Sequence, residues 1–202
     1  MKRTVICLVG SMVSGKGDVG KHLERELGFT YESLSDRVRE EVDARGVERL
    51  RENLMDIGND LRETNGNAVL AERTFELLRN TTGDIVIDAV RNPGEIEFLR
   101  RELGALVFGI DAPQEKRLEW YLARAEVRGE DRATPEDFYR ADSRDYGVGE
   151  ADSGQQVGRC LELADCIIFN DGSKKQLFEK VEYYLILNGF SPEGARRSQE
   201  IK

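Results

Sequence analysis

Short apolar runs alternate with longer amphipathic stretches along this chain of 202 residues. Apolar runs of about four to eight residues between turn signals are typical of buried strands, and longer amphipathic stretches predict helices. Regular alternation of the two indicates a parallel sheet with helices on both faces. Strands are predicted over residues 4–9, 29–33, 84–88, 105–111 and 166–170.

Helices are predicted in the gaps between these strands. Two of them, between the second and third strands, are too polar to be fully buried, so we expect them to carry an exposed face. The clearest helices are predicted over residues 18–27, 35–45, 48–63 and 67–79.

The domain organisation follows from length and local composition. About 100–200 residues make one domain, so we expect a single domain over residues 1–190. Residues 124–158 are rich in Arg, Asp, Glu and Gly and poor in large apolar residues, which predicts a mobile insertion rather than core, with a loop over 147–156. Residues 191–202 form a polar tail.

Composition narrows the range of partners. Lys and Arg number 30 against 39 Asp and Glu, a formal net charge of −9, which disfavours binding to nucleic acid or an anionic membrane. An anionic ligand therefore needs a local basic site. The three cysteines, Cys7, Cys160 and Cys166, show no CxxC spacing, so we expect neither a disulfide framework nor a zinc site, and a cytoplasmic protein.

The segment from Gly10 to Gly17 fits the pattern GxxxxGK between a predicted strand and a predicted helix. Glycines let the backbone surround phosphates closely, while amide N–H groups and the helix N-terminus supply positive potential. Lys16 is expected to reach the β and γ phosphates of a nucleotide. A glycine-rich turn without a ligand is the alternative. The candidate phosphate-binding residues are Gly10, Ser11, Ser14, Gly15, Lys16, Gly17 and Asp18.

Two residues depart from the usual form of this loop. Gly17 occupies the position where Ser or Thr would contact magnesium, so the metal is expected to be held through water and by carboxylates elsewhere. Asp18 is favoured by the helix dipole, but it would repel a triphosphate unless it helps to order magnesium. The sequence does not decide whether Asp18 repels the nucleotide or helps to order magnesium.

The Gly-Lys-Gly end of the loop resembles the nucleoside monophosphate kinases of the adenylate kinase type. The segment Ser33-Leu-Ser-Asp36-Arg37-Val-Arg39 is similar to the Ser-Thr-Gly-Asp-x-x-Arg that binds the acceptor's phosphate in those enzymes. The resemblance implies that Arg39 binds that phosphate, with Asp36 beside it. Alternatively, Arg37 and Arg39 solvate an exposed helix.

The third predicted strand ends in Asp88, and an acid at that place beside a phosphate loop is typical of a magnesium site. The run Asp88-Ala-Val-Arg91-Asn-Pro is similar to Ile-Asp-Gly-Ile-Arg-Asn-Pro of AAA-type ATPases related to dephospho-coenzyme A kinase. The resemblance implies that Asp88 organises magnesium, which it holds through water, and that Arg91 is a second ligand of the acceptor's phosphate. Glu95 takes the place of a base-reading Gln, although helix-start glutamates are also common for dipole reasons.

The run Asp-Ala-Pro-Gln-Glu-Lys-Arg at residues 111–117 again resembles dephospho-coenzyme A kinase. The arginines that follow correspond to a short helical lid over the transferring phosphoryl group, where positioned cations lower the barrier. Arg124 and Arg144 are the first candidates, with Arg128 and Arg132 behind them. Interleaved charges of both signs also suit a solvated helical face.

The last predicted strand ends in Asn-Asp171-Gly172-Ser173-Lys, similar to the turn that packs on the donor's adenine in adenylate kinases. The resemblance implies that Asp171 and Gly172 contact adenine. An ordinary strand-to-helix turn with Ser173 as the N-cap is compatible with this role.

The resemblance covers residues 4–188 and implies a three-layer α/β P-loop kinase fold with a five-stranded parallel sheet in the order 2-3-1-4-5. It implies phosphoryl transfer from ATP, with Mg²⁺, to a nucleoside or deoxynucleoside monophosphate. One alternative is a hydroxyl acceptor such as dephospho-coenzyme A, for which Asp36 is the candidate base. Another is a nucleotide-binding switch that hydrolyses ATP slowly.

Overall fold

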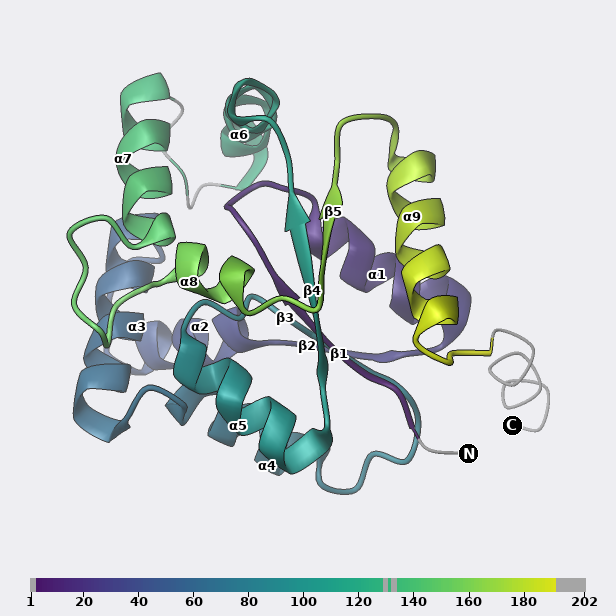
Figure 1. The fold of residues 1–202 in the computed structure, drawn as a ribbon. Helices are drawn as coiled ribbons and strands as arrows, with labels where there is room; N and C mark the ends of the chain where they lie inside the picture. The colour runs from purple at the N-terminus through teal and green to yellow at the C-terminus, as the bar shows by residue number, and fades with distance from the viewer. Residues whose placement is uncertain (1–2, 129–130, 132–133, 192–202) are drawn as a thin grey trace.

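In the computed structural model, which describes residues 3–128, 131 and 134–191, five strands form one all-parallel sheet (Figure 1). The sheet order is β2-β3-β1-β4-β5, so the predicted P-loop kinase topology is confirmed. All five predicted strands are present. They are β1 (Val5–Val9), β2 (Thr30–Ser33), β3 (Ile85–Asp88), β4 (Leu106–Asp111) and β5 (Cys166–Phe169).

The four helices predicted by range are also present, with shifted ends. The first begins at Lys16, earlier than predicted, with Gly15 as its N-cap. The helices of the described part of the chain are α1 (Lys16–Leu27), α2 (Leu34–Ala44), α3 (Arg51–Asn65), α4 (Val69–Leu78), α5 (Pro93–Leu103), α6 (Gln114–Arg128), α7 (Pro135–Tyr146), α8 (Val157–Glu162) and α9 (Lys174–Leu187).

Both faces of the sheet are buried. Alternate residues of β1 point to opposite sides: Val5 and Cys7 join a core with α2, α3, α4, α5 and α8, whereas Ile6 and Leu8 join a core with α1 and α9. Figure 1 shows these two helical layers on either side of the strands. The strands β1, β3 and β4 are therefore almost wholly apolar, whereas the edge strand β2 is polar and half-buried, and polar groups also lie where the strands end.

The helices α6 and α7 stand beyond the carboxyl ends of the strands (Figure 1). We expected residues 124–158 to stay out of the core, but Phe138 of α7 is fully buried against Tyr121 of α6 and Met12 of the P-loop. The expectation missed this cluster because few apolar residues suffice to join two helices to a loop. Residues 147–156 form the predicted loop. A helical cap thus lies over the P-loop.

Candidate active site

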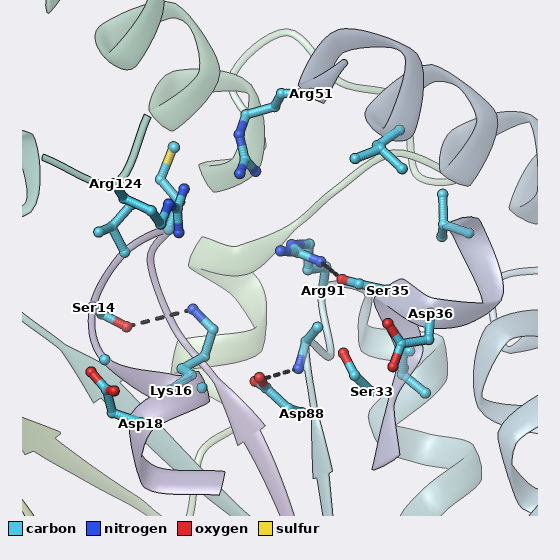
Figure 2. Close-up of a pocket in the computed structure, with 18 of the residues that line it drawn as sticks. Ser14, Lys16, Asp18, Ser33, Ser35, Asp36, Arg51, Asp88, Arg91 and Arg124 are labelled. Carbon is cyan, nitrogen blue, oxygen red and sulfur yellow. Dashed lines mark hydrogen bonds between the residues drawn. The ribbon is translucent and has the colours of Figure 1, made fainter. Parts of the chain in front are cut away.

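A cleft of about 890 Å³ opens at the carboxyl ends of the strands, between the P-loop, α2, α3 and α6. This volume lies in the upper part of the range of small-molecule sites, about 300–1,000 Å³. Figure 2 shows Lys16, Arg51, Arg91 and Arg124 around one central space. The predicted site residues that line the cleft are Ser14, Gly15, Lys16, Gly17, Asp18, Asp36, Arg39, Asp88, Arg91, Arg124 and Gly172.

The P-loop is held in shape by close backbone approaches to the neighbouring strands. Gly10 has φ 139°, and a Cβ there would collide with the carbonyl oxygen of Ile110. Gly15 has φ 105°, and a Cβ there would lie 2.7 Å from Nδ2 of Asn170, which donates to the carbonyl of Ser14 at 3.0 Å. Because the loop is fixed in this way, the N-terminus of α1 presents its free N–H groups at the cleft.

Lys16 lies within this loop and is only 7% exposed. Its Nζ donates to the carbonyl oxygens of Gly10 and Ser11 at 2.6 and 2.7 Å. Burial lowers the pKa of Lys16 to about 8, against the opposing effect of the Asp88 carboxylate. Direct phosphate ligands would line the cleft, as we predicted for Gly10 and Ser11, but neither residue does. Their carbonyl oxygens instead hold the lysine from behind.

Asp88 ends β3 with both carboxylate oxygens hydrogen-bonded. Oδ1 accepts from the backbone N–H of Ala89 at 2.6 Å, and Oδ2 accepts from the hydroxyl of Tyr31 at 3.0 Å. Burial, followed by the charge of Asp88, raises the pKa of Tyr31 well above its usual value, so the phenol stays a donor. Tyr31 was not among the predicted residues; it reaches Asp88 because Gly20 leaves room for its ring.

The donor set at Asp88 fits a magnesium ion held mainly by phosphates and water. A Cβ on Gly17 would lie 3.8 Å from Oδ2 of Asp88, so the carboxylate sits beside the position where Ser or Thr is usual. No group of three or more metal-ligating side chains occurs among the described residues. One carboxylate suits Mg²⁺, which keeps several waters and uses substrate phosphates.

On the opposite wall, two arginines are each hydrogen-bonded to side chains of the protein. Arg91 donates from Nε to Asp145 and from Nη1 to the hydroxyl of Ser35, each at 2.9 Å. Arg39 pairs with Asp36 at 2.9 Å. Both arginines line the cleft. Figure 2 shows Arg91 and Ser35 across the open space from Lys16.

Two further arginines, from α3 and α6, meet at one buried acid. Asp131, whose side chain is 0% exposed, accepts hydrogen bonds from Arg51 and from Arg124, the latter at 2.7 Å. Burial alone raises the pKa of Asp131, but the bonds and charges of the two arginines hold it below its usual value. Arg51 was not predicted, since nothing near it in sequence indicates a site. The side chain of Arg128, and Arg132, lie outside the described residues.

The structure does not place Glu95 where a base could reach it. Its side chain is fully buried in the capping box of α5, where Oε2 accepts from the N–H groups of Arg91 and Asn92 at 2.8 and 3.0 Å. Oε1 accepts from Arg62 at 2.9 Å. Both oxygens are thus engaged within the protein, and the predicted hydrogen bond to an exocyclic amine has no free acceptor.

Arg144 is likewise outside the cleft. It pairs with Glu150 at 2.8 Å and with Asp56 at 3.0 Å. It borders a separate cavity of about 170 Å³ between α3, α6 and α7. The resemblance implied a lid position beside Arg124, but Arg144 lies on α7 and pairs with α3 and with the loop after α7 instead.

The turn before α9 divides the predicted adenine residues. Gly172 lines the cleft, whereas Asp171 pairs with Lys180 at 2.8 Å and does not line it. Ser173 accepts from the N–H of Gln176 at 3.3 Å, which confirms the predicted N-cap. Asp18 pairs with Lys174 at 3.0 Å. This exposed pair offsets the charge of Asp18 beside the P-loop, although such pairs contribute little stability.

The cysteines and helices bear on the remaining sequence expectations. Cys7, Cys160 and Cys166 are all free thiols. Within residues 3–128, 131 and 134–191, no helix combines the length and apolar character needed to cross a membrane.

The chain resembles known proteins in sequence. A family profile described as "AAA domain" matches residues 9–139. The "UPF0200 protein PH1008" of Pyrococcus horikoshii is 31% identical over 184 residues, covering 88% of this chain and 94% of that protein.

Two solved structures share the fold. TT1252 from Thermus thermophilus superposes with a TM-score of 0.61 at 16% identity, over 95% of this chain and 100% of that one. Shikimate kinase from Acinetobacter baumannii, in complex with shikimate, gives 0.56 at 19% identity, over 94% and 96%. At these identities the likeness shows the fold alone. The chain belongs to the UPF0200 family and has a P-loop kinase-like domain.

Proposed function

We propose that this protein transfers a phosphoryl group from ATP, with Mg²⁺, to a nucleoside monophosphate. The observation that carries the proposal is the second set of cations in the cleft: Arg91 lies across the open space from Lys16 (Figure 2), and Arg39 lines the same cleft. A P-loop alone is sufficient to bind a nucleotide. A separate pair of arginines, each fixed by partners, supports a second phosphate-bearing ligand.

The residues of the cleft would then have separate roles in the reaction. The N–H groups at the start of α1 and the ammonium of Lys16 bind the donor's phosphates, and Arg91 orients the acceptor. Arg51 and Arg124 supply positive charge where it develops during transfer. A phosphate acceptor is already anionic, so no general base is required.

Magnesium would contribute neutralisation of charge on the donor's phosphates when bound. Asp88 is the residue that would hold it, through water, with Tyr31 and the N–H of Ala89 fixing the carboxylate. Removing hydrogen-bond partners of this kind commonly lowers metal affinity by about 10–100-fold.

A second candidate is transfer to a hydroxyl group. Asp36 lines the cleft, and its carboxylate, paired with Arg39, is available at the acceptor wall as a general base. A compound such as dephospho-coenzyme A would need such a base.

The test is an ADP-release assay with ATP and Mg²⁺ against a panel of nucleoside and deoxynucleoside monophosphates and dephospho-coenzyme A. We expect at least one monophosphate to raise ADP release well above the rate with ATP alone. Stimulation by dephospho-coenzyme A only would favour the hydroxyl acceptor. A slow ATPase that no acceptor stimulates would instead favour a nucleotide-binding switch.

A further inference from the structure

A largely apolar slot extends the cleft between α2, α3 and α4. The side chains of Val38, Leu54, Met55 and Leu70 line it, together with Gly58. These helices belong to the layer that also carries Arg39 and faces away from α1 and α9 (Figure 1). A slot of this composition suits a flat, mainly apolar group rather than another phosphate.

One charged group in this slot has an unused donor. Arg62 is 3% exposed, and its Nε and Nη2 each lie 2.9 Å from Oε1 of Glu95. Its Nη1 is buried and has no hydrogen-bond partner. Buried donors are almost always paired, because leaving one unpaired costs free energy. Since Arg62 also lines the cleft, the geometry leaves Nη1 for a ligand.

Gly58 gives a second, independent indication that a ligand lies beside Arg62. Glycine inside a helix lowers stability relative to alanine, and Gly58 lies in the interior of α3 without a positive φ. A Cβ there would meet Val38 at 3.6 Å and Nη1 of Arg62 at 3.7 Å, which are ordinary contacts. Neither the backbone nor the packing requires glycine. The missing methyl group leaves space directly beside the unused donor.

Gln155 adds a group of the opposite kind. It lines the same cleft, and its Oε1 is buried without a partner. The cleft therefore offers an unpaired donor from Arg62 and an unpaired acceptor from Gln155. A ring in which a carbonyl oxygen adjoins an N–H can pair with both groups when its carbonyl oxygen faces Nη1. In the amino counterpart the donor and the acceptor exchange places, so an amino group facing Nη1 would leave both protein groups unpaired.

We infer that the slot holds the planar base of the acceptor with its exocyclic group at Nη1 of Arg62, so that Arg62 selects a base with a ring carbonyl over its amino counterpart. The inference rests on the proposed function, because it takes the acceptor's phosphate to lie at Arg39 and Arg91. Arg62 is thus a specificity-determining residue, in addition to anchoring α3 to Glu95.

Calorimetric binding without ATP tests the selection. Two pairs of monophosphates differ mainly in a carbonyl against an amino group: inosine with adenosine, and uridine with cytidine. We expect the carbonyl member of at least one pair to bind about tenfold or more tightly, in keeping with a lost charge-assisted bond. Ribose 5-phosphate, which has no base, should bind more weakly still. Equal binding within both pairs, or ribose 5-phosphate binding as tightly as the nucleotides, would overturn the inference.

Two variants separate recognition from folding. Gly58→Ala should keep or raise the melting temperature while weakening the preferred monophosphate about tenfold or more, because the methyl group fills the space beside Nη1. Gly83→Ala is the matched control: Gly83 is exposed, with nothing within 4 Å of an added Cβ, and should change neither value. Arg62→Lys, if it folds, should lose the carbonyl preference. Unchanged binding in Gly58→Ala would contradict the inference.

The same reagents distinguish failure of the inference from failure of the proposed function. A carbonyl preference that Gly58→Ala removes, without ADP formation from any acceptor, would leave the slot assignment standing and refute transfer. If ribose 5-phosphate supported ADP formation as efficiently as any nucleotide, phosphoryl transfer would stand and the slot assignment would be refuted.

Discussion

The P-loop wall of the cleft comes from one continuous stretch of chain, whereas the opposite wall is assembled from α2, α3 and the segment after β3. In the first, close backbone approaches place Gly10 against β4 and Gly15 against Asn170, and backbone carbonyls of the loop itself hold Lys16. In the second, ion pairs between distant residues place the arginines, as Asp145 places Arg91 and Asp131 places Arg51. A wall built from backbone tolerates few amino-acid substitutions. In a wall built from side-chain pairs, individual side chains can be exchanged more readily.

The largest effect is expected on the P-loop wall. Lys16→Met keeps a similar length and removes the charge, and should lower the rate of ADP formation by at least about 10²–10³-fold, the effect of losing one positioned hydrogen-bond donor in other active sites. The fold should persist, checked by circular dichroism and a cooperative melt. Near-normal turnover in this variant would remove Lys16 from the site.

Asp88 should give the next largest effect, because it joins the P-loop wall to the metal. Asp88→Asn keeps the shape and loses the charge, so the magnesium concentration for half-maximal rate should rise about 10–100-fold. Tyr31→Phe, which removes only the hydrogen bond to Oδ2, should give a smaller shift in the same direction. Identical magnesium titrations for parent and Asp88→Asn would contradict this role.

The acceptor wall is tested by Arg39 against Arg144. Losing one charge-assisted contact costs roughly 1.5–3 kcal/mol, so Arg39→Ala should raise the acceptor's KM about 10–100-fold with little change in the KM for ATP. Arg144→Ala should change neither, because Arg144 borders a different cavity. If the KM for ATP rises equally in Arg39→Ala, that arginine contacts the donor.

This difference between the walls also explains which features the sequence could predict and which it could not. The strands, their order and the P-loop follow from local patterns and a motif with fixed spacing. Glu95 shows the limit of spacing: it matches a base-reading position, but the Asn92-Pro93 start of α5 places its carboxylate in a capping box instead. Arg51, Arg62 and Tyr31 depend on residues 80, 33 and 57 positions away, which no local pattern contains.

A moderate effect of pH is expected at the P-loop. With a pKa of about 8, Lys16 of the free protein loses its proton above pH 8, whereas bound phosphates favour the ammonium form. ATP binding should therefore take up a proton, and its Kd should rise by up to about tenfold per pH unit above pH 8. Calorimetry in buffers of different ionisation enthalpy measures the uptake. Lys16→Met should abolish this dependence, and a flat Kd between pH 7 and 9.5 would refute it.

The smallest effect concerns Ala89, at the point where the two walls meet. Ala89 has φ 63°, a left-handed conformation that costs an alanine roughly 1–2 kcal/mol, at a position where the resembling Asp-Gly motif has glycine. Glycine relieves this strain but loses about 0.5–1 kcal/mol through the greater freedom of the unfolded chain. Ala89→Gly should therefore raise the free energy of unfolding by up to about 1 kcal/mol, measured by urea denaturation. The rate should not change, because residue 89 keeps the N–H that donates to Asp88. Ala123→Gly, in the exposed part of α6, is the control and should lower stability by about 1 kcal/mol. A loss of stability in both variants would show that position 89 carries no strain that glycine relieves.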